Sequence, residues 1–221
     1  MPKAEIKVIL FDLGNVLVDF DLNPAIKRIS RFCSKDPGTI FKLLLSSGIT
    51  NSFETGRLSA EEFYEKTKEA LGLKLGYASF VPIWNEVFFF SSKNRAVYHI
   101  ANLLKKNYRI ALLSNTNILH YKYIKDSFPI FDIFDKVFLS FEMGAIKPDK
   151  IIYQKAIKAL GVLPEHIFYT DDRAELIDSA SRLGIKSFIF TNAEQLIKDL
   201  SSLDIVLMDT QASFPPEIFF P

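Results

Sequence analysis

Polar side chains in four segments of this sequence lie at or near the expected ends of strands. Asp12 follows VILF, Ser114 follows RIALL, and the pair Asp171–Asp172 follows IFYT. A further apolar run, KVFL, leads into FEMGAIKP, which contains Lys147. Ligands of an open parallel sheet bind beyond the carboxyl ends of its strands. The sequence therefore predicts that three carboxylates, a hydroxyl and a lysine meet at one edge of a sheet.

The acidic pair Asp171–Asp172 indicates a bound cation. Neighbouring carboxylates repel each other, and their pKa values rise unless a positive charge lies close by. Mg²⁺ is a hard cation that takes oxygen ligands, and it would remove this cost. A helix N-cap is the alternative use of these aspartates, but a cap needs only one of them. We therefore favour a metal site.

The other polar groups have structural explanations of their own. Asp12 suits a turn or a cap, Ser114 suits the cap of the next helix, and a lysine such as Lys147 is usually a solvated surface group. For Ser114 the two roles are compatible, because a helix N-terminus also binds phosphate. Three histidines lack metal-ligand spacing and are expected to be structural or exposed: His99, His120 and His166.

Five short apolar runs predict the strands of a parallel sheet. Each spans four or five residues whose hydrophobic members are consecutive and not alternating, as in strands covered on both faces. Helical patterns separate most of them, and Gly161 and Gly184 follow the ends of two helical patterns, where a C-cap is expected. The fold class is therefore α/β, a Rossmann-like, doubly wound parallel sheet. The predicted strands are residues 7–11, 109–113, 136–139, 167–170 and 186–190, and the predicted helices are residues 93–106, 118–127, 149–160, 174–183 and 193–200.

Residues 18–90 break this alternation, because they contain helical patterns and no clear strand. Ser59 is followed three residues later by Glu62, which fits a capping box. An insertion of this length is too long for an ordinary crossover and predicts a small inserted helical domain, here called the cap. Helices are expected over 24–33, 37–45, 60–71 and 77–88. The cap is assigned to residues 18–89 and the core to residues 1–17 and 90–221.

Composition narrows the classes of function. The formal charge is +1, which supports neither a nucleic-acid partner nor an acidic membrane surface. Cys33 is a lone cysteine in a helical pattern, so an intrachain disulfide and a cysteine-rich zinc site are excluded. The sequence has no membrane-spanning run and no signal peptide, so a cytoplasmic protein is expected. It carries no pattern that specifies an oligomeric state. Residues 212–221 are expected to form an extended surface tail.

The four segments, in this order and with this insertion, resemble the haloacid dehalogenase superfamily of hydrolases over nearly the whole chain. FDLGNVLVD, LSNTN and Lys147–Pro148 are also similar to a sugar-phosphate phosphatase branch, and FETGRLS is similar to the cap segment of that branch. The resemblance implies a Rossmann-like core with a helical cap. It also implies a small phosphorylated substrate, such as a sugar phosphate.

The resemblance further implies phosphoryl transfer through an aspartyl-phosphate, with Asp12 as the nucleophile. Mg²⁺ would be held by Asp12, the backbone carbonyl of Gly14 and Asp172, with Asp171 nearby. Carboxylate attack on a phosphate dianion needs cations and donors that offset the repulsion between the two. This requirement gives the remaining polar groups of the motifs a role.

The resemblance implies three groups that offset the repulsion between Asp12 and the substrate phosphate. Ser114 and the backbone around Asn115 would donate hydrogen bonds to the phosphoryl oxygens, and Lys147 would neutralise charge on the nucleophile and the transferring group. We also take Asn15 and Glu54 as candidates for substrate binding. Aromatic cap residues such as Trp84, Phe80 and 88–90 can line the cleft, although packing is the commoner use of such residues.

Two positions depart from the family pattern. Phosphatases of this superfamily usually carry a second Asp two positions after the nucleophile, which acts as general acid and base. Gly14 occupies that position here, so a water, a substrate group or a cap residue would replace it, with Glu54 as the cap candidate. Otherwise the enzyme is slow or its chemistry differs. Leu176 stands where the fourth motif often has Asn or Asp, with Glu175 next to it.

Three other functions are weighed against the phosphatase. A 2-haloacid dehalogenase also lacks the second Asp and would use Asp12 on carbon without metal, but the pair Asp171–Asp172 disfavours it. A catalytically weak binding protein on the same fold stays open, because fold does not determine function. The retained Asp12, Ser114, Lys147 and Asp172 argue against that hypothesis, whereas the missing second Asp argues for it. A phospho-receiver domain fits worse, because its acidic pair comes first and it has no helical insertion.

Overall fold

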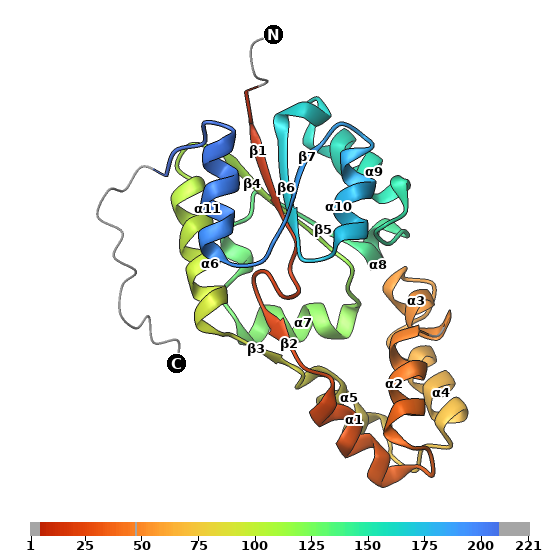
Figure 1. Ribbon diagram of the computed structural model, residues 1–221. Coiled ribbons are helices and arrows are strands. Elements are labelled where there is room, and N and C mark those ends of the chain that lie inside the picture. Colours follow the sequence, from red (N-terminus) through yellow and green to blue (C-terminus); the bar gives the residue numbers. More distant parts are fainter. Residues whose placement is uncertain (1–4, 47, 208–221) are drawn as a thin grey trace.

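The computed structural model describes residues 5–46 and 48–207, and it shows an α/β core with a helical body beside it (Figure 1). The core contains a five-stranded parallel sheet in the order β5-β4-β1-β6-β7. This is the order of a doubly wound sheet, with its switch point beside β1. The predicted class is confirmed, and each predicted strand is found to within one residue at either end. The strands are β1 (Val8–Phe11), β4 (Arg109–Ser114), β5 (Lys136–Leu139), β6 (Ile167–Asp171) and β7 (Lys186–Ile189).

Alternate residues of the strands supply two hydrophobic cores, one on each face of the sheet. Val8 and Leu10 of β1 pack into one core, and Ile9 and Phe11 pack into the other. This follows from the two-residue period of a strand. Figure 1 shows the helices that cover the two faces. They are α6 (Ser92–Leu104) and α11 (Ala193–Ser202) on the side of Phe11, and α9 (Lys150–Leu160) and α10 (Ala174–Ser181) on the side of Leu10.

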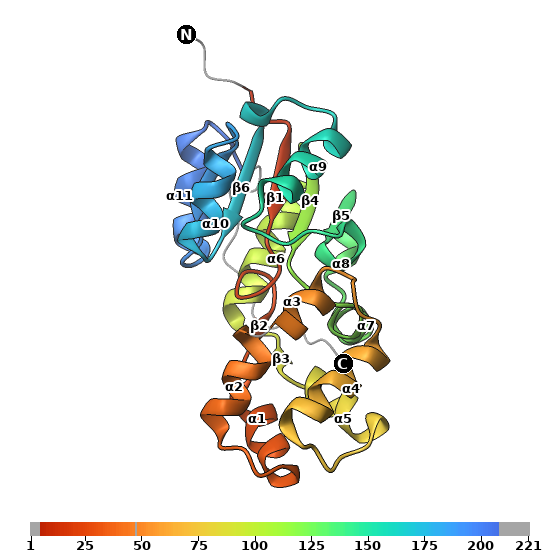
Figure 2. The ribbon, with the colours of Figure 1, turned by 90° about the vertical axis from the view of Figure 1, so that its right-hand side faces the viewer.

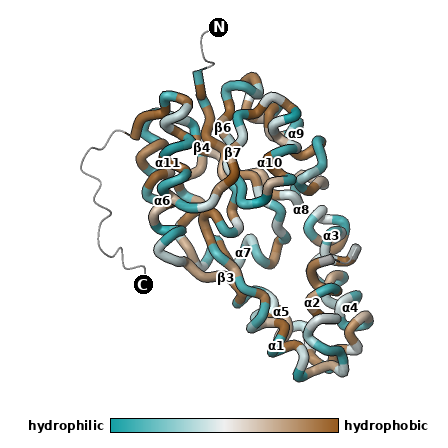
Figure 3. The backbone as a smooth tube through the Cα atoms, viewed as in Figure 1, coloured by the Kyte–Doolittle hydropathy of each residue, from teal (hydrophilic) through white to brown (hydrophobic). Residues whose placement is uncertain are grey.

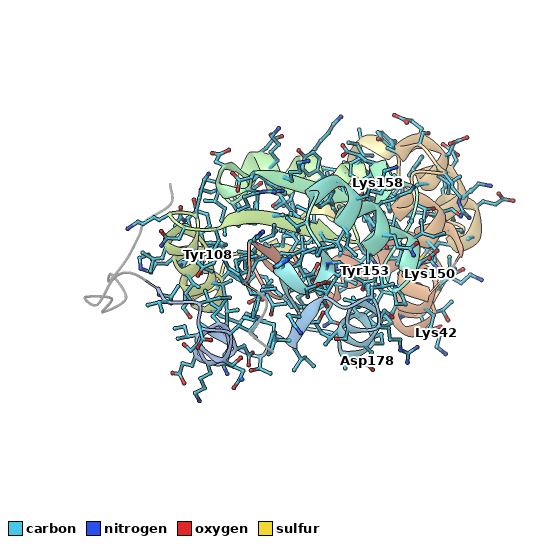
Figure 4. All side chains as sticks on the ribbon, turned by 90° about the horizontal axis from the view of Figure 1, so that it is seen from above. Lys42, Tyr108, Lys150, Tyr153, Lys158 and Asp178 are labelled. Atoms are coloured by element: carbon cyan, nitrogen blue, oxygen red, sulfur yellow. The ribbon has the colours of Figure 1, made fainter. Side chains whose placement is uncertain are left out.

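Helix α9 illustrates how the sequence pattern orients these covering helices. Tyr153 is fully buried against the sheet, where its hydroxyl donates a hydrogen bond to the carbonyl of Leu176 at 3.0 Å. Lys158 on the same helix is exposed, and Figure 4 shows it apart from Tyr153. Figure 3 shows the same division along the backbone, with helices that alternate between hydrophilic and hydrophobic. Gly161 ends α9 at φ 68°, as its position after the helical pattern predicted.

The helical body is inserted between β1 and α6 and has a core of its own. The Phe63 ring stacks on Phe53, with their centroids 4.3 Å apart, and packs 5.0 Å from Trp84. The predicted capping box is confirmed, because the Ser59 hydroxyl accepts from the backbone N–H of Glu62 and the Glu62 carboxylate accepts from that of Ser59. The helices are α1 (Asn23–Ile29), α2 (Pro37–Ser46), α3 (Gly48–Glu54), α4 (Ala60–Leu71) and α5 (Tyr77–Asn85).

The expectation that residues 18–90 contain no strand is wrong. Strand β2 (Asp19–Phe20) pairs antiparallel with β3 (Phe88–Phe89), and this short ladder joins the chain that enters the helical body to the chain that leaves it (Figure 1). Two-residue strands are too short to show a hydrophobic period. Cys33 is also not helical as expected, because α1 ends at Ile29 and a 3-10 turn follows it. Helix α3 was not anticipated.

Two short helices follow the strands at the carboxyl edge of the sheet. Helix α7 (Ile118–Ser127) follows β4, and α8 (Ser140–Met143) follows β5. Within residues 5–46 and 48–207, no helix has both the length and the apolar character that crossing a membrane requires. The tail expected at residues 212–221 lies outside the described residues.

Phe63→Ala tests the independent core of the helical body. The substitution leaves a cavity under Phe53 and Trp84, so we expect the free energy of unfolding to fall by about 3–5 kcal/mol in urea titrations. Phe41→Ala is the matched control, because the Phe41 side chain is 44% exposed. Its effect should stay within about 0.5 kcal/mol. Equal losses in the two variants would contradict the packing described here.

Candidate active site

Side chains from the ends of the strands meet at the carboxyl edge of the sheet. Asp12 follows β1, Ser114 ends β4, and Asp172 follows β6, while Lys147 comes from the loop after α8. These four residues line one cavity of about 410 Å³ that the core shares with the helical body. Asp171 lies beneath them with no exposed surface. The structure therefore brings together the groups that their positions in the sequence predicted to meet.

The Lys147 ammonium is the centre of this arrangement. Its Nζ donates hydrogen bonds to Asp12 Oδ1 at 2.7 Å, to Asp171 Oδ2 at 2.7 Å and to the carbonyl of Leu113 at 3.0 Å. Burial on its own would lower the pKa of Lys147, but the two carboxylates outweigh it and the pKa is raised. The Tyr169 hydroxyl also donates to Asp171. Lys147 is thus a fixed buried cation and not a solvated surface group.

Two side chains hold the loops around Lys147. Asn115 accepts from the backbone N–H of Lys147 at 2.8 Å and donates to its carbonyl at 2.9 Å. Ser140 does the same for Thr116, with both distances 2.9 Å. The segment between Ser114 and α7 is therefore held from two sides. It leads into the N-terminus of α7, where backbone N–H groups favour an anion.

Three carboxylates are crowded at the floor of the cavity. Oxygen atoms of Asp12, Asp171 and Asp172 all lie within 4.8 Å of one another. Burial raises the pKa of Asp12 to about 7, although the Lys147 ammonium opposes the rise, and burial also raises the pKa of Asp172. Such crowding is relieved by a hard divalent cation. Asp12 and Asp172 fit as its ligands, whereas Asp171 is engaged by Lys147.

The loop after β1 orients the carboxylate of Asp172 and lines part of the cavity. Asn15 has φ 56° and donates from Nδ2 to Asp172 Oδ2 at 2.9 Å. Lys93 donates to the Asn15 carbonyl at 2.9 Å and so fixes this turn. Gly14 also lines the cavity, and a Cβ placed on it would lie 3.2 Å from the ring of Phe20. Asn15 thus orients Asp172, a contact that the sequence did not suggest.

The helical body supplies the other wall of the cavity. Leu44, Asn51, Glu54 and Trp84 line it, and Phe88 does so as well. Among the aromatic candidates, Trp84 and Phe88 therefore face the cavity, whereas Phe80 is not among the residues that line it. The wall is largely apolar, which suits a small organic ligand whose charged end lies on the core.

Glu54 carries the carboxyl group that the helical body contributes to the cavity. It ends α3 and is partly buried. Burial raises the pKa of Glu54 to about 7, and the Arg173 guanidinium opposes the rise. Arg173 directly follows Asp172, so Glu54 lies near the acidic floor. Among the described residues, none forms a hydrogen bond or ion pair with the Glu54 carboxylate.

A glycine sets the approach of the helical body to the core beside Glu54. Gly56 has φ 70°, and a Cβ placed there would lie 2.1 Å from the carbonyl oxygen of Phe141 in α8. Only a residue without a side chain fits this contact. Figure 2 shows α3 next to α8. The segment FETGRLS, singled out in the sequence, is therefore where the two bodies touch.

His120 of α7 makes the second link between the bodies. Its Nε2 lies 3.1 Å from the carbonyl oxygen of Trp84, and its ring stacks on Trp84 with centroids 4.7 Å apart. Asn117 Nδ2 lies 3.1 Å from Nδ1, so Nδ1 accepts and Nε2–H donates. Burial lowers the pKa of His120 to about 4, although its bond to Trp84 opposes this. The histidine is structural, as expected.

Leu176, the second departure from the motif pattern, lines the cavity without a polar group. Its neighbour Glu175 does not replace a polar side chain there, because it is exposed and accepts a hydrogen bond from Arg173 Nε at 2.8 Å. Asp171 and Tyr169 support Lys147 from below instead. Tyr169 lies inside an apolar strand, where nothing in the sequence distinguishes it from a packing residue.

Comparison with known proteins identifies relatives that match most of the chain. Residues 6–184 match a family model described as a haloacid dehalogenase-like hydrolase. A D-ribitol-5-phosphate phosphatase from Bacteroides thetaiotaomicron is 31% identical, over 83% of this chain and 91% of its own. The crystal structure of a haloacid dehalogenase-family enzyme from the same organism, in complex with magnesium and inorganic phosphate, superposes with a TM-score of 0.73 at 29% identity, over 85% of this chain and 95% of its own. The structure of a predicted haloacid dehalogenase-like family hydrolase from Porphyromonas gingivalis superposes with a TM-score of 0.75 at 30% identity, over 90% of this chain and 98% of its own.

His120→Gln tests the buried neutral histidine. The ordinary pKa of 6.5 falls to about 4 in the folded protein, so between these values the unfolded chain binds a proton that the folded chain does not. The folded state therefore loses up to about 3 kcal/mol as the pH drops through this window. We expect urea titrations at a series of pH values to show a shallower loss for His120→Gln than for the parent. Parallel curves would contradict this assignment.

Gly56→Ala tests the contact between the two bodies. A methyl group there meets the Phe141 carbonyl, so we expect the backbone amides of α3 to exchange hydrogen at least about tenfold faster than in the parent. Gly72→Ala is the matched control, because Gly72 has a similar φ of 62° and no atom within 4 Å of its added Cβ. If Gly72→Ala accelerates α3 equally, backbone strain and not the contact would be responsible.

Proposed function

The chain belongs to the haloacid dehalogenase-like hydrolases, and on that premise we propose that it removes phosphate from a small phosphorylated metabolite with Mg²⁺ as cofactor. The observation that carries the proposal is the buried hydrogen bond between Lys147 and Asp12 beside a second acidic cavity residue, Asp172. It supports the proposal because a carboxylate, a buried ammonium and a second carboxylate lie around one point of the cavity.

Asp12 is the nucleophile in this proposal. Its carboxylate oxygen forms a bond to phosphorus while the bond from phosphorus to the alcohol oxygen breaks, and water then cleaves the aspartyl-phosphate. Lys147 holds Asp12 at 2.7 Å and offsets the repulsion between this carboxylate and the phosphate dianion. Ser114 and the backbone around Asn115, which both line the cavity, would donate hydrogen bonds to the phosphoryl oxygens. The Asn115 side chain positions Lys147 through two hydrogen bonds with the Lys147 backbone.

Magnesium would be held by Asp12 and Asp172, with the Gly14 carbonyl as a further oxygen ligand. When bound, it neutralises charge on the phosphoryl group. Asn15 orients Asp172 through its 2.9 Å hydrogen bond. The same crowding of carboxylates disfavours a metal-free dehalogenase, because added negative charge gives no benefit to a site that releases halide.

Residues 18–89 act as the cap in this proposal. The ladder of β2 and β3, which lies at the two ends of this segment, supports these boundaries. The cap covers the leaving group, and its wall of Leu44, Asn51 and Trp84 contacts the organic part of the substrate. A cavity of about 410 Å³ suits a metabolite of the size of a sugar or polyol phosphate. The polyol-phosphate phosphatase at 31% identity supports this class as the first to assay.

We further propose that the enzyme acts in the cytoplasm on free metabolites, without a nucleic-acid or membrane partner. A formal charge of +1 provides no electrostatic attraction to polyanions. The single cysteine is typical of proteins from reducing compartments. Both features support the proposal without bearing on the oligomeric state.

Asp12→Asn tests the nucleophile. We expect phosphate release from p-nitrophenyl phosphate and from a panel of sugar and polyol phosphates to fall by about 10⁴-fold or more, because the amide cannot form the covalent intermediate. EDTA should abolish the activity of the parent, and added Mg²⁺ should restore it. Asp178→Asn is the control, because Asp178 lies on the outer surface of α10 (Figure 4) and should leave the rate unchanged. Phosphate release that persists in Asp12→Asn, or in the parent with EDTA, would contradict the proposal.

A further inference from the structure

Cleavage of an alkyl phosphate requires a proton at the leaving oxygen, because an alkoxide is a poor leaving group in water. The core does not offer this proton beside the nucleophile. Gly14 has no side chain, and the Phe20 ring lies 3.2 Å from the place of its missing Cβ. The donor therefore has to come from another group that faces the cavity.

The acidic and basic groups of the cavity floor are already engaged. Asp12 accepts from Lys147, and Lys147 is held between Asp12 and Asp171. Asp172 accepts from Asn15 and belongs to the acidic cluster. None of these groups combines a proton to donate with a position on the leaving-group side of the cavity.

Two basic side chains on the remaining walls do not serve as the donor either. Both ring nitrogens of His120 are engaged, one by Asn117 and the other by the Trp84 carbonyl. The Arg173 guanidinium stays protonated in proteins. Among the described ionisable residues that line the cavity, this leaves Glu54.

The surroundings of Glu54 suit proton transfer. The side chain is on the cap, which covers the leaving group, and its carboxyl group forms no hydrogen bond with a described residue. Gly56, two residues after Glu54, contacts Phe141 of α8 and holds this end of α3 against the core. Burial keeps the pKa of Glu54 at about 7, so both protonation states are populated near neutral pH.

We propose that Glu54 is the general acid and base of the reaction, an inference that rests on the phosphatase function. In the first step the Asp12 carboxylate bonds to phosphorus, the phosphorus–oxygen bond of the ester breaks, and the Glu54 carboxyl proton passes to the departing alcohol oxygen. In the second step the Glu54 carboxylate takes a proton from water as the water oxygen attacks phosphorus. The bond to Asp12 breaks, inorganic phosphate leaves, and Glu54 is protonated again.

The test compares two phosphate esters in Glu54→Gln. Glycerol phosphate releases a weakly acidic alcohol that needs the proton, whereas p-nitrophenyl phosphate releases a stable phenolate that does not. With Mg²⁺ present, we expect kcat/KM for glycerol phosphate to fall by about 10²–10⁴-fold. For p-nitrophenyl phosphate we expect a rapid burst of nitrophenol equal to the enzyme, followed by slow turnover, because the second step lacks its base.

Two further variants test whether the effect depends on the carboxyl group of Glu54. Glu69→Gln removes an exposed carboxylate from α4 of the cap and should behave as the parent. Glu54→Asp keeps a carboxyl group and should recover part of the glycerol phosphate activity. Unfolding midpoints equal to that of the parent would show that the variants are folded. The ratio of kcat/KM for glycerol phosphate to kcat/KM for p-nitrophenyl phosphate does not depend on the amount of active protein.

The outcomes separate the inference from the function on which it rests. Parent-like activity of Glu54→Gln, or an equal loss on both esters without a burst, would overturn the role of Glu54 and leave the phosphatase intact. A parent protein that hydrolyses neither these esters nor the wider panel of phosphates would overturn both. A selective loss with a burst supports the proposal.

Discussion

The buried ammonium of Lys147 is the interaction on which the site depends. It lies between Asp12 and Asp171, with a backbone carbonyl as its third partner. Removing one member of such a buried pair leaves an uncompensated charge and costs about 3–5 kcal/mol. The ends of β1, β4 and β6 and the loop after α8 therefore keep one arrangement, and the carboxylate of Asp12 is held in place before any substrate arrives.

Crowding of negative charge explains why that arrangement suits phosphoryl transfer. Lys147 is the cation that hydrogen-bonds the three-carboxylate cluster, because the neighbouring Arg173 is paired with Glu175, and burial already raises the pKa values of Asp12 and Asp172. The site is thus short of positive charge, a deficit that a divalent cation meets. Substrate phosphate adds further negative charge, so a site with this cluster and no cation would repel its own ligand.

Much of the fold was predictable, because the hydrophobic residues of each strand are consecutive and the polar residue at or just after the strand's end marks the edge of the sheet where the cavity lies. Asp12, Ser114 and Asp172 were found in this way. The contacts that join the cap to the core were not, because Gly56 against Phe141 depends on a tertiary approach that leaves no periodic signal. The strands β2 and β3 were missed because two residues are too few to show a hydrophobic period, and Tyr169 is concealed within an apolar strand.

Placing the proton donor on the cap has a consequence for selectivity. Asp12 and Lys147 belong to the core, whereas Glu54 belongs to the cap, which contacts α8 through Gly56. Leu44 and Trp84 line the same cavity as Glu54, so the organic part of a substrate contacts the cap that carries the proton donor. Binding energy from the organic part of the substrate is then used to complete the catalytic groups. A bare phosphate or water gains no such contacts, so the divided site discriminates against them.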